Sequence, residues 1–91
     1  MHIRWSKQAA DDFSSIVAYI RRDNPTAALR VAQSIYKTTR SLADFPNLGK
    51  VGRVEDTREL PLPPLPFILV YRLSEQAVEV VRILHGAQRW P

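Results

Sequence analysis

A break at Asp23-Asn24-Pro25 divides the first half of the chain into two helical segments, and it constrains the fold more than any other feature. On each side of the break, residues of one predicted buried face recur at helical spacing: first Ala9, Phe13, Ile16, Val17 and Ile20, then Ala28, Val31, Ile35, Thr39 and Leu42. We predict helices over residues 7–22 and 25 to about 43, capped by Ser6 and Asn24. A connection this short folds two helices into an antiparallel hairpin.

The second half of the chain has the composition of a β-sheet. The segments Phe67–Leu73 and Ala77–Leu84 are rich in β-branched and aromatic residues, and the turn at 74–76 between them predicts an antiparallel hairpin. Shorter strands are expected at His2–Trp5, as an edge strand, and at Thr57–Leu62.

Glycine and proline mark the connections. Residues 45–53 hold two of the three glycines and are predicted to form a loop, and the prolines between 61 and 66 predict an extended connection. The order of strand, helix, helix and three strands predicts one α+β domain spanning residues 1–91. In this domain the helical hairpin covers one face of a small antiparallel sheet and leaves the other face open.

The open face is predicted from strand alternation. Ile68, Val70 and Arg72 share one side of their strand. Val80 and Arg82 are assigned to the same open side, because an unpaired arginine beneath the helices would be costly. Ile68, Val70 and Val80 are therefore expected to form an exposed apolar floor beside two arginines, which is typical of a binding surface.

The charge of the chain agrees with several kinds of partner. The formal net charge is +4, from 13 Lys and Arg against 9 Asp and Glu, and only three of the cations are lysine. Arginine suits bidentate contacts with carboxylates and phosphates. An acidic protein, a nucleic acid and a merely solvated basic surface all fit this balance.

Composition excludes several kinds of site. There is no cysteine, so disulfides and thiolate metal sites are excluded, and His2 and His85 lack the spacing of a metal site. We expect no cofactor. The N-terminal sequence lacks the apolar core of a signal peptide and no apolar run is long enough to span a membrane, so a cytoplasmic location is expected.

Fragments spread along nearly the whole chain resemble one known family. They are, in order, WSKQAADDF, YIRRDNPTAA, FPNLGKVGR, TREL and VRILHGAQRWP. Together these fragments resemble toxins of the RelE/ParE superfamily of type II toxin–antitoxin systems, and most closely its ParE branch. The resemblance implies a helical hairpin packed on a small sheet. It also implies an antitoxin, ParD-like or similar, whose acidic C-terminal segment wraps the toxin.

The superfamily implies two alternative activities. RelE-type members cut mRNA on the ribosome, whereas ParE-type members bind DNA gyrase and block it after DNA cleavage. RNA cleavage needs a base, an acid and cations around the phosphate. RelE-like nucleases resemble one another in carrying an arginine where this chain has Ile68, and several have an aromatic residue where this chain has Gly86. Arg58, Arg72, Arg82 and His85 remain as the nuclease set.

The lack of an arginine at position 68 and of an aromatic residue at position 86 favours a gyrase inhibitor. The alternative functions are an mRNA nuclease and a non-toxic protein that only binds its antitoxin. The residues predicted to contact antitoxin or target are Arg53, Arg58, Ile68, Val70, Arg72, Val80, Arg82, His85, Arg89 and Trp90.

Structural roles compete with these assignments. Arg82 must pair inside the fold or on a partner, and Glu59 or Glu79 is its expected internal partner. His85 is more simply a hydrogen-bonding residue at a strand end. Trp90 is expected to pack back onto the sheet as a tether, and Gly49 and Gly52 are explained as turn formers.

Overall fold

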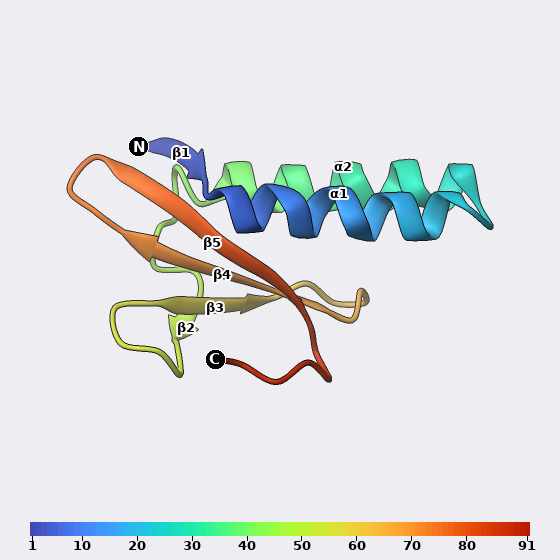
Figure 1. The fold of residues 1–91 in the computed structure, drawn as a ribbon. Coiled ribbons are helices and arrows are strands. Elements are labelled where there is room, and N and C mark those ends of the chain that lie inside the picture. The colour runs from blue at the N-terminus through green and yellow to red at the C-terminus, as the bar shows by residue number, and fades with distance from the viewer.

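The computed structural model describes residues 1–91 as two helices and five strands. The elements are β1 (His2–Trp5), α1 (Lys7–Arg21), α2 (Pro25–Ser41), β2 (Lys50–Val51), β3 (Arg58–Pro61), β4 (Phe67–Leu73) and β5 (Ala77–His85). The two helices lie side by side as a layer on one face of the sheet, and the opposite face carries no helix (Figure 1). The predicted α+β class and the helical hairpin are confirmed.

Both helices begin at the predicted capping residues. The Ser6 hydroxyl accepts a hydrogen bond from Ala9 N at 3.0 Å, and the Asn24 side chain accepts one from Ala27 N at 3.0 Å. Each bond satisfies a backbone donor that the first helical turn leaves free. The helices end one and about two residues earlier than predicted, at Arg21 and Ser41. Neither helix has the length and apolar character needed to cross a membrane.

The strands form one sheet in the order β1-β5-β4-β3-β2. All neighbouring pairs are antiparallel except β1 and β5, which run parallel with Ile3 beside Val78 and Trp5 beside Val80. The prediction of a wholly antiparallel sheet is therefore wrong at this edge. Parallel neighbours need a long connection across the sheet, and α1, α2 and the three strands that follow provide it.

Strand β2 was predicted to be loop. Lys50 and Val51 pair with Glu59 and Arg58 of β3, so this short strand forms the second edge of the sheet. Strand β3 itself covers Arg58–Pro61, slightly less than the predicted segment. A strand of two residues between glycines has no alternation pattern, and only its partner strand reveals it.

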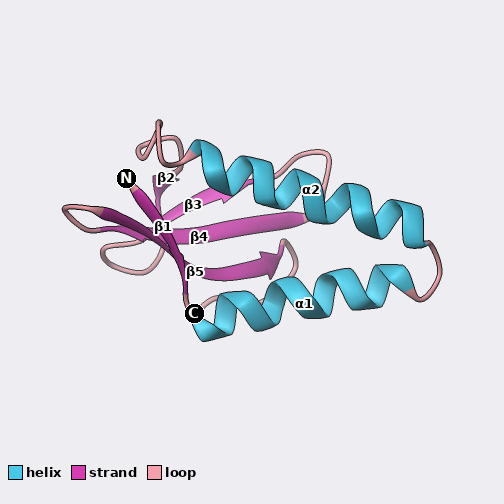
Figure 2. Cartoon of the chain, turned by 90° about the horizontal axis from the view of Figure 1, so that it is seen from above, coloured by secondary structure: helices cyan, strands magenta, loops and turns pink.

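The main core lies between the helices and the sheet. Its buried members are Ala9, Ile35, Leu42, Leu62, Leu69, Tyr71, Val78, Val80 and Ile83. Trp5 stacks on Phe13 with ring centroids 5.6 Å apart, which joins β1 to α1. From above, α1 lies towards β5 and α2 towards β3, so each helix is positioned by a different side of the sheet (Figure 2).

Tyr71 ties the loop after α2 to the centre of the sheet. Its buried hydroxyl donates to Pro46 O at 2.7 Å and accepts from Gly49 N at 2.8 Å. A Cβ added at Gly49 would lie 2.8 Å from the Tyr71 ring, so any larger residue would push the loop off the ring. Gly49 is therefore explained by close approach, and no glycine in the chain has a positive φ.

Tyr71→Phe should lower the free energy of unfolding by about 1–3 kcal/mol, because it leaves the partly buried Pro46 carbonyl and the buried Gly49 N–H unpaired. Urea unfolding followed by circular dichroism measures this. Tyr19→Phe is the matched control, since Tyr19 is 71% exposed and should leave the midpoint unchanged. Equal midpoints for the two variants would contradict the anchoring role of Tyr71.

Candidate functional site

A β-bulge changes which side chains face away from the helices. Val70 is paired with Arg82, but the next residue, Tyr71, is paired with Val80, so one residue of β5 has no partner. Because of this extra residue, Val80 lies on the core side with Tyr71, and Arg82 lies on the helix-free side with Val70. The prediction that Val80 belongs to the open face is therefore wrong, since simple alternation does not hold across a bulge.

The expected apolar floor is largely covered. Val70 and Val80 are both 0% exposed, and Leu84, which shares the helix-free side with Ile68, is 1% exposed. Only Ile68 of the three predicted floor residues is partly accessible. The helix-free face is therefore defined by its charged side chains.

Arg82 is held by α1. Its guanidinium donates from Nε and NH2 to the two carboxylate oxygens of Asp12, at 2.7 and 3.1 Å. These hydrogen bonds raise the pKa of Arg82 above its ordinary value, so the side chain stays charged. The internal partner is Asp12, and the expected partners Glu59 and Glu79 pair with other arginines. Asp12 was missed because nothing in the sequence shows that α1 runs beside β5.

Glu59 is a buried carboxylate that holds Arg53. Arg53 donates from its backbone N and its Nε to Oε2, at 2.9 and 3.1 Å, and from NH2 to Oε1 at 3.2 Å. Burial alone would raise the pKa of Glu59, but the bonds and charge of Arg53, with the charge of Lys50, outweigh it and lower the pKa. The Arg53 side chain remains 52% exposed, so it can still contact a partner.

A row of charges crosses the sheet at the other end of the helix-free face. Arg72 lies beside Glu79, with Nε 3.7 Å from Oε1, and Arg4 of β1 is the neighbour of Glu79 on its other side. Arg4 was not predicted as a site residue. The alternation of residues 2–5 shows that Arg4 faces outward, but not that β1 lies next to β5.

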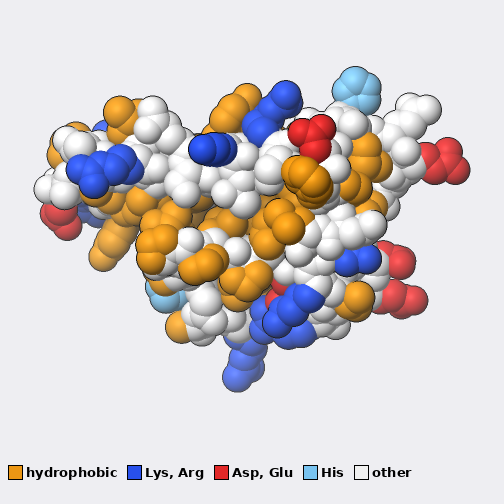
Figure 3. All heavy atoms as spheres, turned by 180° about the vertical axis from the view of Figure 1, so that it is seen from behind, with side chains coloured by type: hydrophobic (Ala, Val, Ile, Leu, Met, Phe, Trp, Pro, Cys, Tyr) orange, Lys and Arg blue, Asp and Glu red, His pale blue; other side chains and the backbone are white.

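Cations therefore outnumber acids on this side of the molecule. Lys50 shares the face through its pairing with Glu59, and Arg89 is exposed on the C-terminal segment. The cations are Arg4, Lys50, Arg53, Arg72, Arg82 and Arg89, against the acids Glu59 and Glu79 and the carboxylate of Asp12. Viewed from behind, hydrophobic side chains gather under the helical layer, and several Lys and Arg side chains lie below them (Figure 3).

A hollow of about 420 Å³ opens on this face. Its lining comes from β2 and the loop after it, from β3 and β4, and from the start of the C-terminal segment: Lys50, Val51, Gly52, Arg53, Glu59, Ile68 and Gly86. Ile68 is half-buried and is the apolar side chain on this side, because Val51 is paired with Arg58 and shares its helix side. An apolar surface beside Lys50 and Arg53 can accept a partner residue that combines an apolar group with a carboxylate or phosphate.

The C-terminal segment returns beneath the sheet on the side away from the helices (Figure 1). Gly86 N–H donates to Pro66 O at 2.7 Å, and the Trp90 ring lies 5.9 Å from the Arg82 guanidinium carbon. Trp90 thus packs back on the sheet, as expected. His85 is exposed, its ring edge meets Phe67, and its Nδ1 accepts from Ala87 N at 3.2 Å.

The residues of the nuclease set are not brought together. Arg58 lies on the helix side of β3 and donates to Gly49 O at 2.7 Å. Arg72 and His85 lie at opposite ends of the β4–β5 hairpin, beside Glu79 and Phe67 respectively. Five residues of strand separate those ends, which is about 17 Å. Arg82 is already bound by Asp12.

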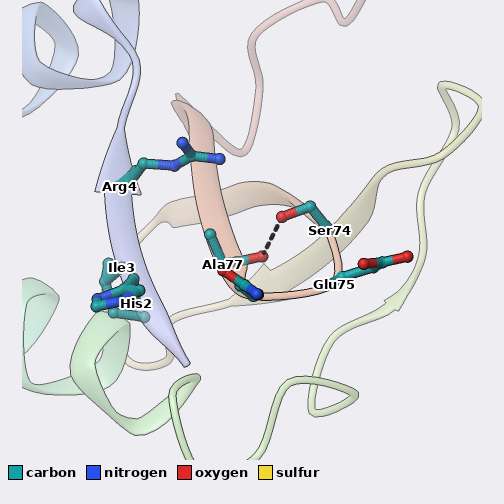
Figure 4. A pocket seen from close by; sticks show the side chains of 7 residues that line it. His2, Ile3, Arg4, Ser74, Glu75 and Ala77 are labelled. Carbon is teal, nitrogen blue, oxygen red and sulfur yellow. Dashed lines mark hydrogen bonds between the residues drawn. The ribbon is translucent and has the colours of Figure 1, made fainter.

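Another hollow, of about 590 Å³, lies at the far end of the sheet between β1 and the turn before β5 (Figure 4). Its lining includes His2, Arg4, Ser74 and Glu75, and Ser74 Oγ donates to Ala77 O at 3.3 Å. His2 lies here, whereas His85 ends β5 at the other end of the sheet. The two histidines therefore cannot share a ligand, and no group of three or more His, Asp or Glu side chains could hold a metal.

Glu59→Gln should lower the free energy of unfolding by about 1–3 kcal/mol at neutral pH, because Arg53 loses its charged partner. The pKa of Glu59 is lower in the folded chain than its ordinary value of 4.5, so its carboxylate stabilises the fold above that pH. That stabilisation is lost as the pH falls through the folded pKa.

Unfolding midpoints measured from pH 7 to pH 3 should therefore show wild type and Glu59→Gln converging in acid. Glu55→Gln is the control, since Glu55 is exposed and makes no ion pair. A constant difference between wild type and Glu59→Gln at every pH would contradict the ion-pair account.

Comparison with known proteins places the chain in one family. Residues 3–90 match the family described as ParE toxin of the type II toxin–antitoxin system, parDE. The candidate toxin Y4kP of Sinorhizobium fredii is 42% identical over 98% of this chain and 92% of its own length. Toxin RelE2 of Caulobacter vibrioides is 33% identical over 92% of this chain and 93% of its own length.

Solved structures share the fold. A chain from the chromosomal ParDE toxin–antitoxin system of P. aeruginosa superposes with a TM-score of 0.83 at 25% identity, covering 93% of this chain and 95% of its own. The YoeB/ParE toxin of Agrobacterium tumefaciens has a TM-score of 0.65 at 19% identity, covering 93% and 98%. The chain therefore belongs to the ParE family of toxins of type II toxin–antitoxin systems.

Proposed function

We propose that this toxin acts by binding DNA gyrase through its helix-free face and that a cognate antitoxin holds it inactive. The observation that supports this most is the scattering of the nuclease set. Arg58, Arg72 and His85 lie on different faces or ends of the sheet, and the charged Arg82 side chain is already paired with Asp12. A cleavage site needs its acid, base and cations within hydrogen-bond reach of one phosphate.

The helix-free face has the properties of a binding surface. Arg53 and Arg72 each keep half of their side chain exposed although each is paired with a glutamate. Such pairing holds the guanidinium group in one direction while leaving donors free for a partner carboxylate or phosphate. The hollow beside Ile68 gives an apolar group a place between these charges.

The solvent side of the helical hairpin suits the antitoxin. A hollow of about 320 Å³ between α1 and α2 has an apolar lining of Phe13, Val17, Ala18 and Ala32, with Arg21 at its rim. Helix α2 contains no acidic residue. An amphipathic acidic helix fits such a groove, with its apolar residues in the hollow and its carboxylates at the rim.

Further exposed residues extend this surface along α2. Leu29 and Tyr36 are exposed apolar residues, and the exposed cations are Arg30, Lys37 and Arg40, none of which makes an ion pair. The solved relative in the ParDE system is described as part of a toxin–antitoxin system, which supports an antitoxin partner here.

The second candidate function is cleavage of mRNA on the ribosome, which is favoured by the fold shared with RelE-type toxins and by the presence of Arg58, Arg82 and His85. A translation extract programmed with a defined mRNA tests it directly. Toxin-dependent cleavage of this mRNA would support this function over gyrase binding, provided that the cleavage disappears in the His85→Ala and Arg82→Ala variants.

Purified toxin should inhibit supercoiling by DNA gyrase and should increase cleaved DNA recovered after detergent treatment. Ile68→Glu should reduce this inhibition strongly, because it places a carboxylate beside the buried Glu59 in the hollow. Thr26→Glu is the control, since it adds the same charge at an exposed position at the far end of the helical hairpin. Full gyrase activity in excess wild-type toxin would refute the proposed target.

The toxin–antitoxin complex should survive salt concentrations that screen exposed ion pairs, because its centre is the apolar groove between the helices. Ala32→Asp should weaken the complex by placing a like charge opposite the acidic helix, and Gln33→Asp should weaken it less. Calorimetry at low and high salt measures the affinity of the antitoxin for wild-type toxin and for the two variants. Complete dissociation of the wild-type complex at high salt would show that the interface is mainly ionic.

A further inference from the structure

We propose that Asp12 is a positioning residue that fixes the C-terminal segment on the helix-free face by holding Arg82. The inference rests on the proposed function, because it concerns how the binding face is kept in shape. It follows from a continuous series of contacts that runs from α1 through Arg82 to Trp90.

The first contact in this series is between α1 and the edge of β5. Asp12 Oδ2 accepts a hydrogen bond from the backbone N–H of Ile83 at 2.9 Å as well as from Arg82 Nε at 2.7 Å. The Asp12 carboxylate therefore pairs with the Ile83 N–H at the edge of β5 and also holds the Arg82 side chain. The Asp12 and Arg82 side chains are only 18% and 23% exposed, so little water competes with these bonds.

The second contact is between Arg82 and the indole ring of Trp90, whose centroid lies 5.9 Å from the guanidinium carbon. A guanidinium over an indole face is attracted by the ring electrons. The fork of hydrogen bonds to Asp12 restricts the guanidinium plane, so it also restricts where the ring can lie. Arg82 could otherwise adopt many rotamers, and ordering a long side chain opposes folding.

The docked position of Trp90 is only weakly favoured. Its indole Nε1 is buried and has no hydrogen-bond partner, which disfavours the docked ring. Gly86 N–H fixes the start of the segment by donating to Pro66 O at 2.7 Å, but residues 87–89 add only local contacts, such as Gln88 N–H donating to His85 O at 2.8 Å and His85 N–H donating to Gln88 Oε1 at 3.2 Å. Arg82 is therefore the contact that decides whether the end of the chain stays docked.

This arrangement links the two faces of the molecule. Asp12 belongs to α1 in the helical layer, while the C-terminal segment that carries Arg89 and Trp90 runs on the helix-free side (Figure 1). Asp12 contacts Arg82, and Arg82 contacts Trp90. A change at Asp12 therefore alters the surface that the C-terminal segment offers to a partner. In this sense Asp12 acts through Arg82.

The test uses Trp90 fluorescence in a Trp5→Phe background, where Trp90 is the only tryptophan. Asp12→Asn should shift its emission to the red and increase quenching by acrylamide, because losing the charged fork favours the undocked segment roughly tenfold. Asp12→Glu should restore part of the protection. Asp11→Asn is the matched control, since Asp11 is exposed, pairs with Lys7 and should change nothing.

A second variant keeps the test decisive if Asp12→Asn loses stability. Arg82→Met leaves Asp12 free to accept from Ile83 N–H, so the strand edge stays satisfied while the contact with Trp90 is lost. Circular dichroism should show a folded protein with a freely quenched Trp90. Unchanged quenching in folded Asp12→Asn or Arg82→Met would overturn the proposal.

Gyrase inhibition by the same variants separates the two proposals. If wild type inhibits gyrase, Asp12→Asn should inhibit it less than Asp11→Asn does. If wild type does not inhibit gyrase, the proposed function fails, while the quenching result still decides the role of Asp12. Released Trp90 with full inhibition would overturn the claim that the docked segment belongs to the binding face.

Discussion

The outer edge of β5 beyond β1 is the constraint on which the rest of the structure depends. Strand β1 ends at Trp5, while β5 continues to His85 and leaves backbone groups without a strand partner. Unpaired strand groups are costly when buried and invite aggregation when exposed. Side chains from the start of α1 solve this problem.

Ser6 and Asp12 form hydrogen bonds with backbone groups at this edge of β5. The Ser6 hydroxyl donates to Val81 O at 2.9 Å while it caps α1, and Asp12 accepts from Ile83 N at 2.9 Å. Helix α1 is thereby fixed beside β5, and the short turn to α2 fixes the second helix over the sheet. The β-bulge on the same strand then separates Val80, in the core, from Arg82, on the opposite face.

The same contacts explain the excess positive charge of the helix-free face. Three carboxylates are each paired with one arginine of this face: Asp12 with Arg82, Glu59 with Arg53 and Glu79 with Arg72. Arg4, Lys50 and Arg89 therefore remain without an ion-pair partner, and a partner that brings carboxylates or phosphates would supply one. A surface of this kind steers association and selects partners by charge.

Sequence patterns predicted the local structure well because helical spacing, caps and β-branched runs are local signals. They identified both helices, β4 and β5, and the return of Trp90 to the sheet. They failed where the answer depends on residues distant in the chain. Val80 was placed on the wrong face because a bulge depends on the partner strand, and Asp12 was missed because α1 meets Arg82 only in the folded chain.

We propose that the toxin works through its helix-free face by binding a protein target. The most direct measurement is the exchange of backbone amide hydrogens with and without DNA gyrase. Protection should appear at Lys50–Arg53, at Ile68 and in residues 86–90, with little change along α2. Protection confined to α1 and α2, or no protection at saturating gyrase, would contradict the account.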